Sequence, residues 1–182
     1  MSMRRLVFMA ACLGLFCGAS AFAADGPGLG KPITEADLAP WDISIMPDGT
    51  GLPAGNGTAA QGAPIFQNKC SACHGEKGVG GFAAFLNAGP PRASLDGGKS
   101  IANFWGYATT VFDFIRRAMP YTAPKSLTDQ EVYQLTAYVL YLNKLVGEND
   151  VIDAKTLPKV KMPNAGNFII RFPERIEFTR AP

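Results

Sequence analysis

One short segment of the chain has residue types and spacing that are typical of covalent cofactor chemistry. Cys70 and Cys73 are separated by two residues, and His74, the single histidine of the chain, follows directly. Cys-x-x-Cys-His is the pattern at which a c-type haem is attached. The two thiols form thioethers with the haem vinyl groups, and the adjacent imidazole faces the iron. We therefore predict one covalently attached haem c, held by Cys70 and Cys73, with His74 as an axial ligand of the iron.

The first 23 residues have the composition of an export signal. Two arginines precede an uncharged apolar run, and Ala21-Phe22-Ala23 is a small-x-small cleavage site. The apolar run is too short to cross a bilayer comfortably, which argues against a retained membrane anchor. We predict cleavage after Ala23, with cleavage after Ala21 as the alternative. The mature protein is then expected in the periplasm, and it is not expected to be an integral membrane protein.

Cleavage would leave Cys70 and Cys73 as the mature cysteines, which weakens the other uses of the motif. A structural zinc ion needs four ligands, and neither a second cysteine pair nor a second histidine remains. A thioredoxin-like redox pair lies next to a βαβ pattern, which the surrounding sequence lacks. A disulfide across two residues would close too small a loop to stabilise the fold. Haem attachment agrees with both the motif and the export signal.

The second axial ligand of the iron is predicted from the residues that remain. With one histidine and no third mature cysteine, the iron takes a methionine, or the site is open. The mature chain has three methionines, Met46, Met119 and Met162. Met119 is the best candidate. It lies 45 residues after His74 and precedes Pro120, which ends the preceding helix and leaves the thioether on a loop.

Three helices are expected to position these residues in an all-α, haem-wrapping domain. The first, at 61–69, leads into Cys70. The second, at 108–118, has an apolar stripe at helical spacing: Val111, Phe114, Ile115 and Ala118. The third begins at a capping box formed by Thr128 and Glu131 and continues with an apolar repeat from Val132 to Val146. We expect the third helix to pack across the first.

The connection from His74 to Ala108 is expected to be a loop whose aromatic residues partly line the haem pocket: Phe82, Phe85, Phe104, Trp105 and Tyr107. The carbonyl of Pro90 or Pro91 is a candidate for orienting the imidazole. Arg116 and Arg117 are candidates for pairing with the haem propionates or with Asp113, although a solvated helix face is the ordinary role of such residues.

Two extensions flank the predicted haem domain at 61–146. A Gly- and Pro-rich segment at 24–60 precedes it, and an irregular tail at 147–182 follows it. Both contain large apolar residues, so we expect them to lie on a surface of their own domain or of a partner. Without the two signal arginines, the chain has 15 basic and 15 acidic residues. This neutrality argues against nucleic acid as a partner.

A resemblance extends over several longer stretches. They are Trp41-Asp42-Ile43, the run PDGTGLP at 47–53, the run WGYATTVFDFIRRAMP at 105–120, Ser126-Leu127-Thr128 and Met162-Pro163-Asn164. On these stretches, the chain resembles the SoxD-type cytochrome c subunit of sulfane (sulfite) dehydrogenase in periplasmic sulfur oxidation. Gly106 stands where that family run has proline. Some members carry a second haem domain, whereas this chain has one Cys-x-x-Cys-His motif.

The resemblance implies a class I cytochrome c-like fold with irregular N- and C-terminal extensions, and His74 and Met119 as the iron ligands. It also implies a molybdenum-cofactor dehydrogenase subunit as electron donor. We expect a downstream cytochrome c as acceptor and no catalytic centre in this chain, because six-coordinate iron leaves no site for substrate. Two alternatives are a free electron shuttle without a fixed partner, and a haem enzyme or sensor with an open sixth position.

Overall fold

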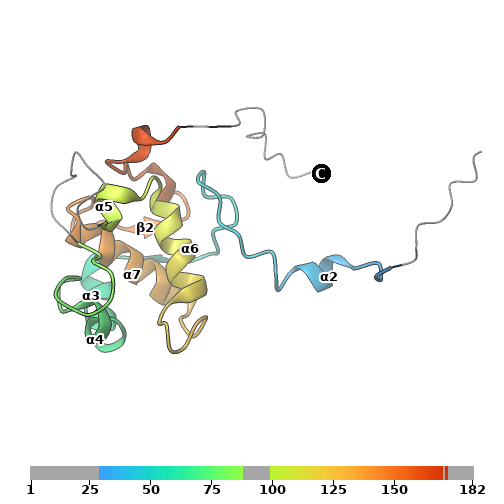
Figure 1. Cartoon of the computed structure of the whole chain (residues 1–182), viewed down its shortest axis with the longest axis horizontal. Helices are drawn as coiled ribbons and strands as arrows, with labels where there is room; N and C mark the ends of the chain where they lie inside the picture. Colours follow the sequence, from blue (N-terminus) through green and yellow to red (C-terminus); the bar gives the residue numbers. More distant parts are fainter. Residues whose placement is uncertain (1–28, 88–98, 170, 172–182) are drawn as a thin grey trace, which may run out of the picture. The chain divides into compact units, whose positions relative to one another are not determined.

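The structure is a computed structural model that describes residues 29–87, 99–169 and 171 (Figure 1). The predicted signal peptide lies outside these ranges. The chain divides into two compact units, Met1–Trp41 and Asp42–Pro182. In the described part of the first unit, helix α2 (Glu35–Leu38) begins at a capping box. There the Thr34 backbone N–H donates to the Asp37 carboxylate at 2.9 Å.

The second unit is mostly helical, as predicted. Its helices are α3 (Ala59–Lys69), α4 (Ser71–His74), α5 (Ile101–Phe104), α6 (Ala108–Ala118) and α7 (Asp129–Leu142). Two short strands, β1 (Asn56–Gly57) and β2 (Ile152–Asp153), and two 3-10 turns, Leu157–Lys159 and Ala165–Asn167, complete the described elements. None of the described helices is long and apolar enough to cross a membrane. Helix α5 lies in the connection that was expected to be a loop.

Helix α7 forms the centre of this unit and packs against both α3 and α6 (Figure 1). The predicted capping box at its start is confirmed, because the Thr128 side chain accepts from the Glu131 backbone N–H. Lys69 at the end of α3 pairs with Glu131 at 2.6 Å, which ties the two helices together. The expected contact between the third and the first helix is therefore confirmed.

The end of α7 differs from the prediction, because the helix stops at Leu142 and Val146 lies beyond it. Asn143 caps the helix, and its side-chain amide donates to the Val139 carbonyl at 2.8 Å and to the Leu86 carbonyl at 2.9 Å. The second of these bonds reaches 57 residues back along the chain. The apolar repeat at 132–146 could not reveal such a distant contact.

Helix α6 has the predicted bounds but two apolar faces. Phe112 is fully buried and packs against Tyr133 of α7, with ring centroids 4.5 Å apart and ring planes tilted by 51°. Phe114, a member of the predicted stripe, remains 45% exposed. Members of the predicted stripe therefore differ in burial, because Val111 is buried whereas Phe114 is half-exposed.

The two predicted extensions contact each other and α7. Asn56 of β1 pairs with Asp153 of β2 in an antiparallel register, and α7 packs against both strands. The Tyr133 hydroxyl of α7 donates to the Pro53 carbonyl at 2.9 Å. Burial, followed by the charge of Asp153, raises the pKa of Tyr133 to about 12. This hydroxyl therefore stays protonated and keeps donating throughout the neutral range.

Gly62 allows α3 to approach α7 closely, and this leads to a stability prediction. A Cβ atom at Gly62 would overlap the backbone carbonyl of Gln134 on α7. We expect Gly62→Ala to destabilise the protein by about 1–3 kcal/mol, the usual cost of overpacking. That cost outweighs the ~1 kcal/mol that alanine adds through helix propensity. The change is measured as a shift of the denaturant midpoint at constant m-value.

Gly166→Ala is the matched control for this prediction. Gly166 is exposed, and no atom lies within 4 Å of a Cβ built on it. Its substitution should change the free energy of unfolding by less than about 0.5 kcal/mol. Equal midpoints for the two variants would show that α3 and α7 can separate without cost.

Candidate functional site

A cavity of about 720 Å³ is lined by all four residues predicted from the sequence to hold the haem. Cys70, Cys73, His74 and Met119 line it, and its volume lies within the range of about 300–1,000 Å³ typical of ligand and cofactor sites. Most of the other lining residues are apolar: Phe66, Phe82, Ala83, Ala84, Phe85, Leu86, Ile101, Trp105, Val111, Phe114, Ile115, Pro120, Leu127, Leu135 and Val139. The tertiary structure thus brings together residues 45 positions apart.

The junction of α3 and α4 presents the two thiols and the imidazole. The Cys70 backbone N–H donates to the Phe66 carbonyl at 2.9 Å, and the His74 N–H donates to the Cys70 carbonyl at 3.0 Å. In a helical turn, residues three and four apart share one side, so Cys70, Cys73 and His74 face the same space. Burial raises the pKa of the Cys70 thiol to about 11. The unmodified thiol is therefore protonated and weakly nucleophilic at neutral pH.

The loop after α4 fixes the orientation of His74. Gly75 has a φ of +80°, and a Cβ there would overlap the Val79 carbonyl, so this tight turn needs glycine. The loop then returns, and the Ala84 carbonyl lies 2.9 Å from Nδ1 of His74. A carbonyl only accepts, so Nδ1 carries the proton and donates it. Nε2 is left with its lone pair free to bind a metal.

Ala84 takes the place that the sequence analysis gave to Pro90 or Pro91. Both prolines lie outside the described residues. The observed contact to Ala84 spans 10 residues, so it belongs to the loop that directly follows the motif. No composition signal marks Ala84, because its contribution is a backbone oxygen. A short Gly-rich loop after a metal-ligating histidine is the feature that could have suggested it.

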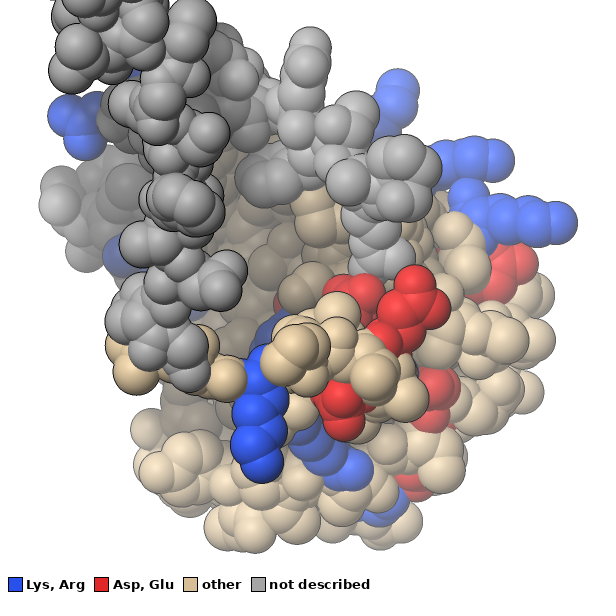
Figure 2. Space-filling model, turned by 90° about the vertical axis from the view of Figure 1, so that its right-hand side faces the viewer, with Lys and Arg blue, Asp and Glu red and all other residues tan. Residues whose placement is uncertain are grey.

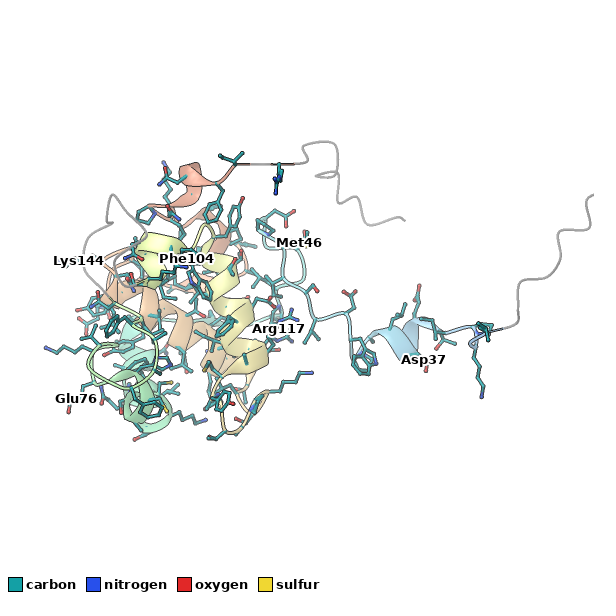
Figure 3. All side chains as sticks on the ribbon, viewed as in Figure 1. Asp37, Met46, Glu76, Phe104, Arg117 and Lys144 are labelled. Atoms are coloured by element: carbon teal, nitrogen blue, oxygen red, sulfur yellow. The ribbon has the colours of Figure 1, made fainter. Side chains whose placement is uncertain are left out.

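The three methionines of the predicted mature chain have different surroundings in the structure. Helix α6 ends at Ala118, and Met119 follows in an extended conformation and lines the cavity. Met162 is 4% exposed and belongs to the hydrophobic core. Met46 lies in a turn closed by its backbone N–H, which donates to the Thr50 carbonyl at 2.9 Å (Figure 3). Neither Met46 nor Met162 lines the cavity.

Aromatic side chains form part of the wall, and three of the five rings named from the sequence contribute to it. Phe82, Phe85 and Trp105 line the cavity, whereas Phe104 and Tyr107 do not. Phe114 of α6 was not among these five but also lines the cavity, where it meets Trp105 edge to face with ring centroids 5.5 Å apart. The cavity thus lies beside the apolar stripe on α6, of which Val111, Phe114 and Ile115 line it.

The C-terminal extension supports this wall from behind. The Asn164 side-chain amide donates to the Phe104 carbonyl at 2.6 Å, at the end of α5. The Phe168 ring lies against Gly106, where a Cβ would come within 2.9 Å of the ring. Glycine at position 106 therefore makes room for Phe168. Both contacts hold the backbone on either side of Trp105.

Arg116 and Arg117 have protein partners. Arg116 pairs with Asp129 at 2.8 Å, and Arg117 pairs with Asp113 at 2.7 Å. Arg117 also donates to the Ile43 carbonyl at 3.4 Å, and Figure 3 shows it on the side of α6 that faces the segment after Trp41. Neither arginine lines the cavity. The expected pairing of Asp113 is confirmed for Arg117, and the possible role of the arginines at haem propionates has no support.

Comparison with known proteins places this site in context. Residues 57–139 match the family model described as cytochrome C oxidase, cbb3-type, subunit III. Thiosulfate dehydrogenase of Psychrobacter arcticus is 30% identical over 113 residues, which are 59% of this chain and 34% of that protein. The chain therefore spans about a third of the length of this curated relative.

The solved structure of the sulfane dehydrogenase SoxCD from Paracoccus pantotrophus shares the fold, with a TM-score of 0.73 and 30% sequence identity. The similarity covers 86% of this chain and 79% of that chain. This is much more of the chain than residues 57–139, so the likeness includes residues of the extensions as well as the cavity.

Proposed function

The chain belongs to the SoxD-like cytochromes c of sulfur oxidation, and on that premise we propose that it accepts single electrons from a molybdenum-cofactor dehydrogenase subunit that oxidises a sulfur compound. The gathering of two cysteines, a histidine and a methionine around one apolar cavity carries this proposal. The family implies haem c, and we propose a single haem, because the sequence has one Cys-x-x-Cys-His motif. When bound, haem c supplies an iron centre that gains and loses one electron.

The four lining residues predicted from the sequence each have a defined role in this proposal. Cys70 and Cys73 would hold the haem through thioethers, and Nε2 of His74 and the thioether of Met119 would bind its iron. The bond from His74 to Ala84 keeps the imidazole in the required tautomer and orientation. The apolar wall excludes water, and a dry wall together with a methionine ligand favours a high reduction potential.

The mouth of the cavity gives a route for electron exchange. Phe82 and Tyr121 line the cavity and are 86% and 83% exposed. A cofactor in the cavity is therefore close to the surface beside these rings. On the face drawn in Figure 2, acidic and basic side chains are both present and neither sign covers it, in line with the balanced charge of the predicted mature chain.

The remaining parts of the proposal concern the cellular setting. We place the mature protein in the periplasm after cleavage at Ala23, with a downstream cytochrome c as electron acceptor. The haem domain is residues 61–146, and the extensions at 24–60 and 147–182 support it and contribute to partner binding. The similarity to SoxCD beyond residues 57–139 supports a role for the extensions.

A pull-down of the tagged protein from native periplasm tests the partnership. Molybdenum and haem are quantified in the purified fraction, sulfite is added, and reduction of the haem is followed by absorption. We expect molybdenum to co-purify and the haem to be reduced by sulfite, while sulfate, the matched control, leaves it oxidised. If haem is recovered without molybdenum and is not reduced by sulfite or thiosulfate, the result would favour a free electron shuttle. Immediate binding of carbon monoxide to the reduced protein would favour an open sixth position.

A further inference from the structure

Ser100 is a buried polar residue of the cavity wall whose hydroxyl proton has no acceptor among the described residues. It lines the cavity, and it is 2% exposed. Its backbone N–H donates to the Asn103 side chain at 2.6 Å. In the capping box of α5 its hydroxyl oxygen faces the Asn103 backbone N–H, and within the described ranges no group accepts the hydroxyl proton. Because buried polar groups are normally satisfied, this hydroxyl points to a partner that belongs to the contents of the cavity.

Lys99 brings a positive charge to the same part of the wall. It lines the cavity, and its ammonium lies 4.7 Å from the centre of the Phe104 ring, which Figure 3 shows on α5. A contact with a ring face leaves N–H donors of the ammonium available. Among the described residues, no carboxylate forms an ion pair with Lys99.

The other candidate cations have carboxylate partners. Lys69 also lines the cavity, but it pairs with Glu131 at 2.6 Å. Arg116 and Arg117 pair with aspartates and lie outside the lining. Lys99 is thus the lining cation whose charge is not matched by any described carboxylate.

We propose that Ser100 and Lys99 together bind a carboxylate of the group that fills the cavity. The inference rests on the proposed function, in which that group is haem c and the carboxylate is one of its propionates. An ionised carboxylate only accepts hydrogen bonds, and Ser100 and Lys99 are adjacent donors, one neutral and one charged. The site places the propionate end of the haem toward α5 and satisfies the Ser100 hydroxyl.

The test uses the purified haem-loaded protein and its variants Ser100→Ala and Lys99→Gln. The readouts are the propionate bending vibration in resonance Raman spectra and the reduction potential. Both variants should shift the vibration to lower frequency, because the propionate loses a donor, and leave the axial-ligand absorption bands unchanged. Lys99→Gln should also lower the potential, because a nearby positive charge favours the electron-rich reduced haem.

Matched variants separate this role from a structural one. Ser126→Ala and Lys155→Gln make the same changes at exposed positions outside the cavity lining and should leave both readouts unchanged. If Ser100→Ala does not fold, Ser100→Thr is measured in its place. It keeps a hydroxyl and should show the propionate vibration of the wild-type protein. Native spectra and potentials in both Ser100→Ala and Lys99→Gln would overturn the carboxylate site and leave the proposed function intact. A wild-type chain that acquires no haem would overturn both.

Discussion

Replacement of both Cys70 and Cys73 by serine is expected to abolish covalent haem attachment. Serine keeps the shape of the side chain but replaces the sulfur that forms the thioether with oxygen. In the wild-type protein, haem should remain with the polypeptide on a denaturing gel and after extraction with acidified organic solvent. In the double variant, all haem should pass into the organic phase, and peroxidase staining of the denatured chain should disappear.

The single variants and a nearby serine make this experiment specific. Cys70→Ser and Cys73→Ser should each retain one thioether and resist extraction in part. Ser71→Ala removes the hydroxyl that donates to the Gln67 carbonyl at 2.7 Å, in the same turn, and should retain haem fully. Haem that resists extraction from the double variant would mean that another side chain forms the covalent bond.

Met119→Leu is expected to have the largest effect on the reduction potential. Leucine has nearly the same volume, so the change removes the sulfur and leaves the packing close to native, at a cost below about 1.5 kcal/mol. The charge-transfer absorption of a methionine–iron bond should vanish. The potential should fall by on the order of 0.1 V, within the roughly 0.8 V that axial ligands span. Carbon monoxide should then bind the reduced protein rapidly.

The other two mature methionines provide matched controls. Met162 is 4% exposed and Met46 lies in a turn, and neither lines the cavity. Met162→Leu and Met46→Leu should therefore preserve the spectrum and the potential. An unchanged spectrum in Met119→Leu, with a loss in one of the other variants, would transfer the ligand to that residue.

Local sequence patterns were sufficient for the elements that carry the proposed ligands. The helix at 108–118 was predicted with its observed bounds, and the capping box between Thr128 and Glu131 is confirmed. The helix that leads into Cys70 begins two residues earlier than predicted, at Ala59. Caps and helical spacing are set by residues within a few positions of each other, so the sequence contains the whole interaction.

The order of residues in the motif also determined its chemistry. Cys70, Cys73 and His74 are within one helical turn of each other, and any fold that keeps this turn presents them together. Family membership followed from longer runs in the sequence and agrees with the comparisons.

Only the tertiary structure decided which distant residues meet these elements. Ala84, rather than a proline, accepts from His74, and Met119 lies at the cavity whereas Met46 and Met162 do not. The stripe on α6 lines the cavity with Val111, Phe114 and Ile115, and Val111 is also part of the core. These contacts depend on how loops close and how helices cross. Both result from many weak interactions between residues that are far apart in the sequence. The sequence therefore determined the residue types of the proposed ligands, and the packing of α3, α6 and α7 determined which residues surround them.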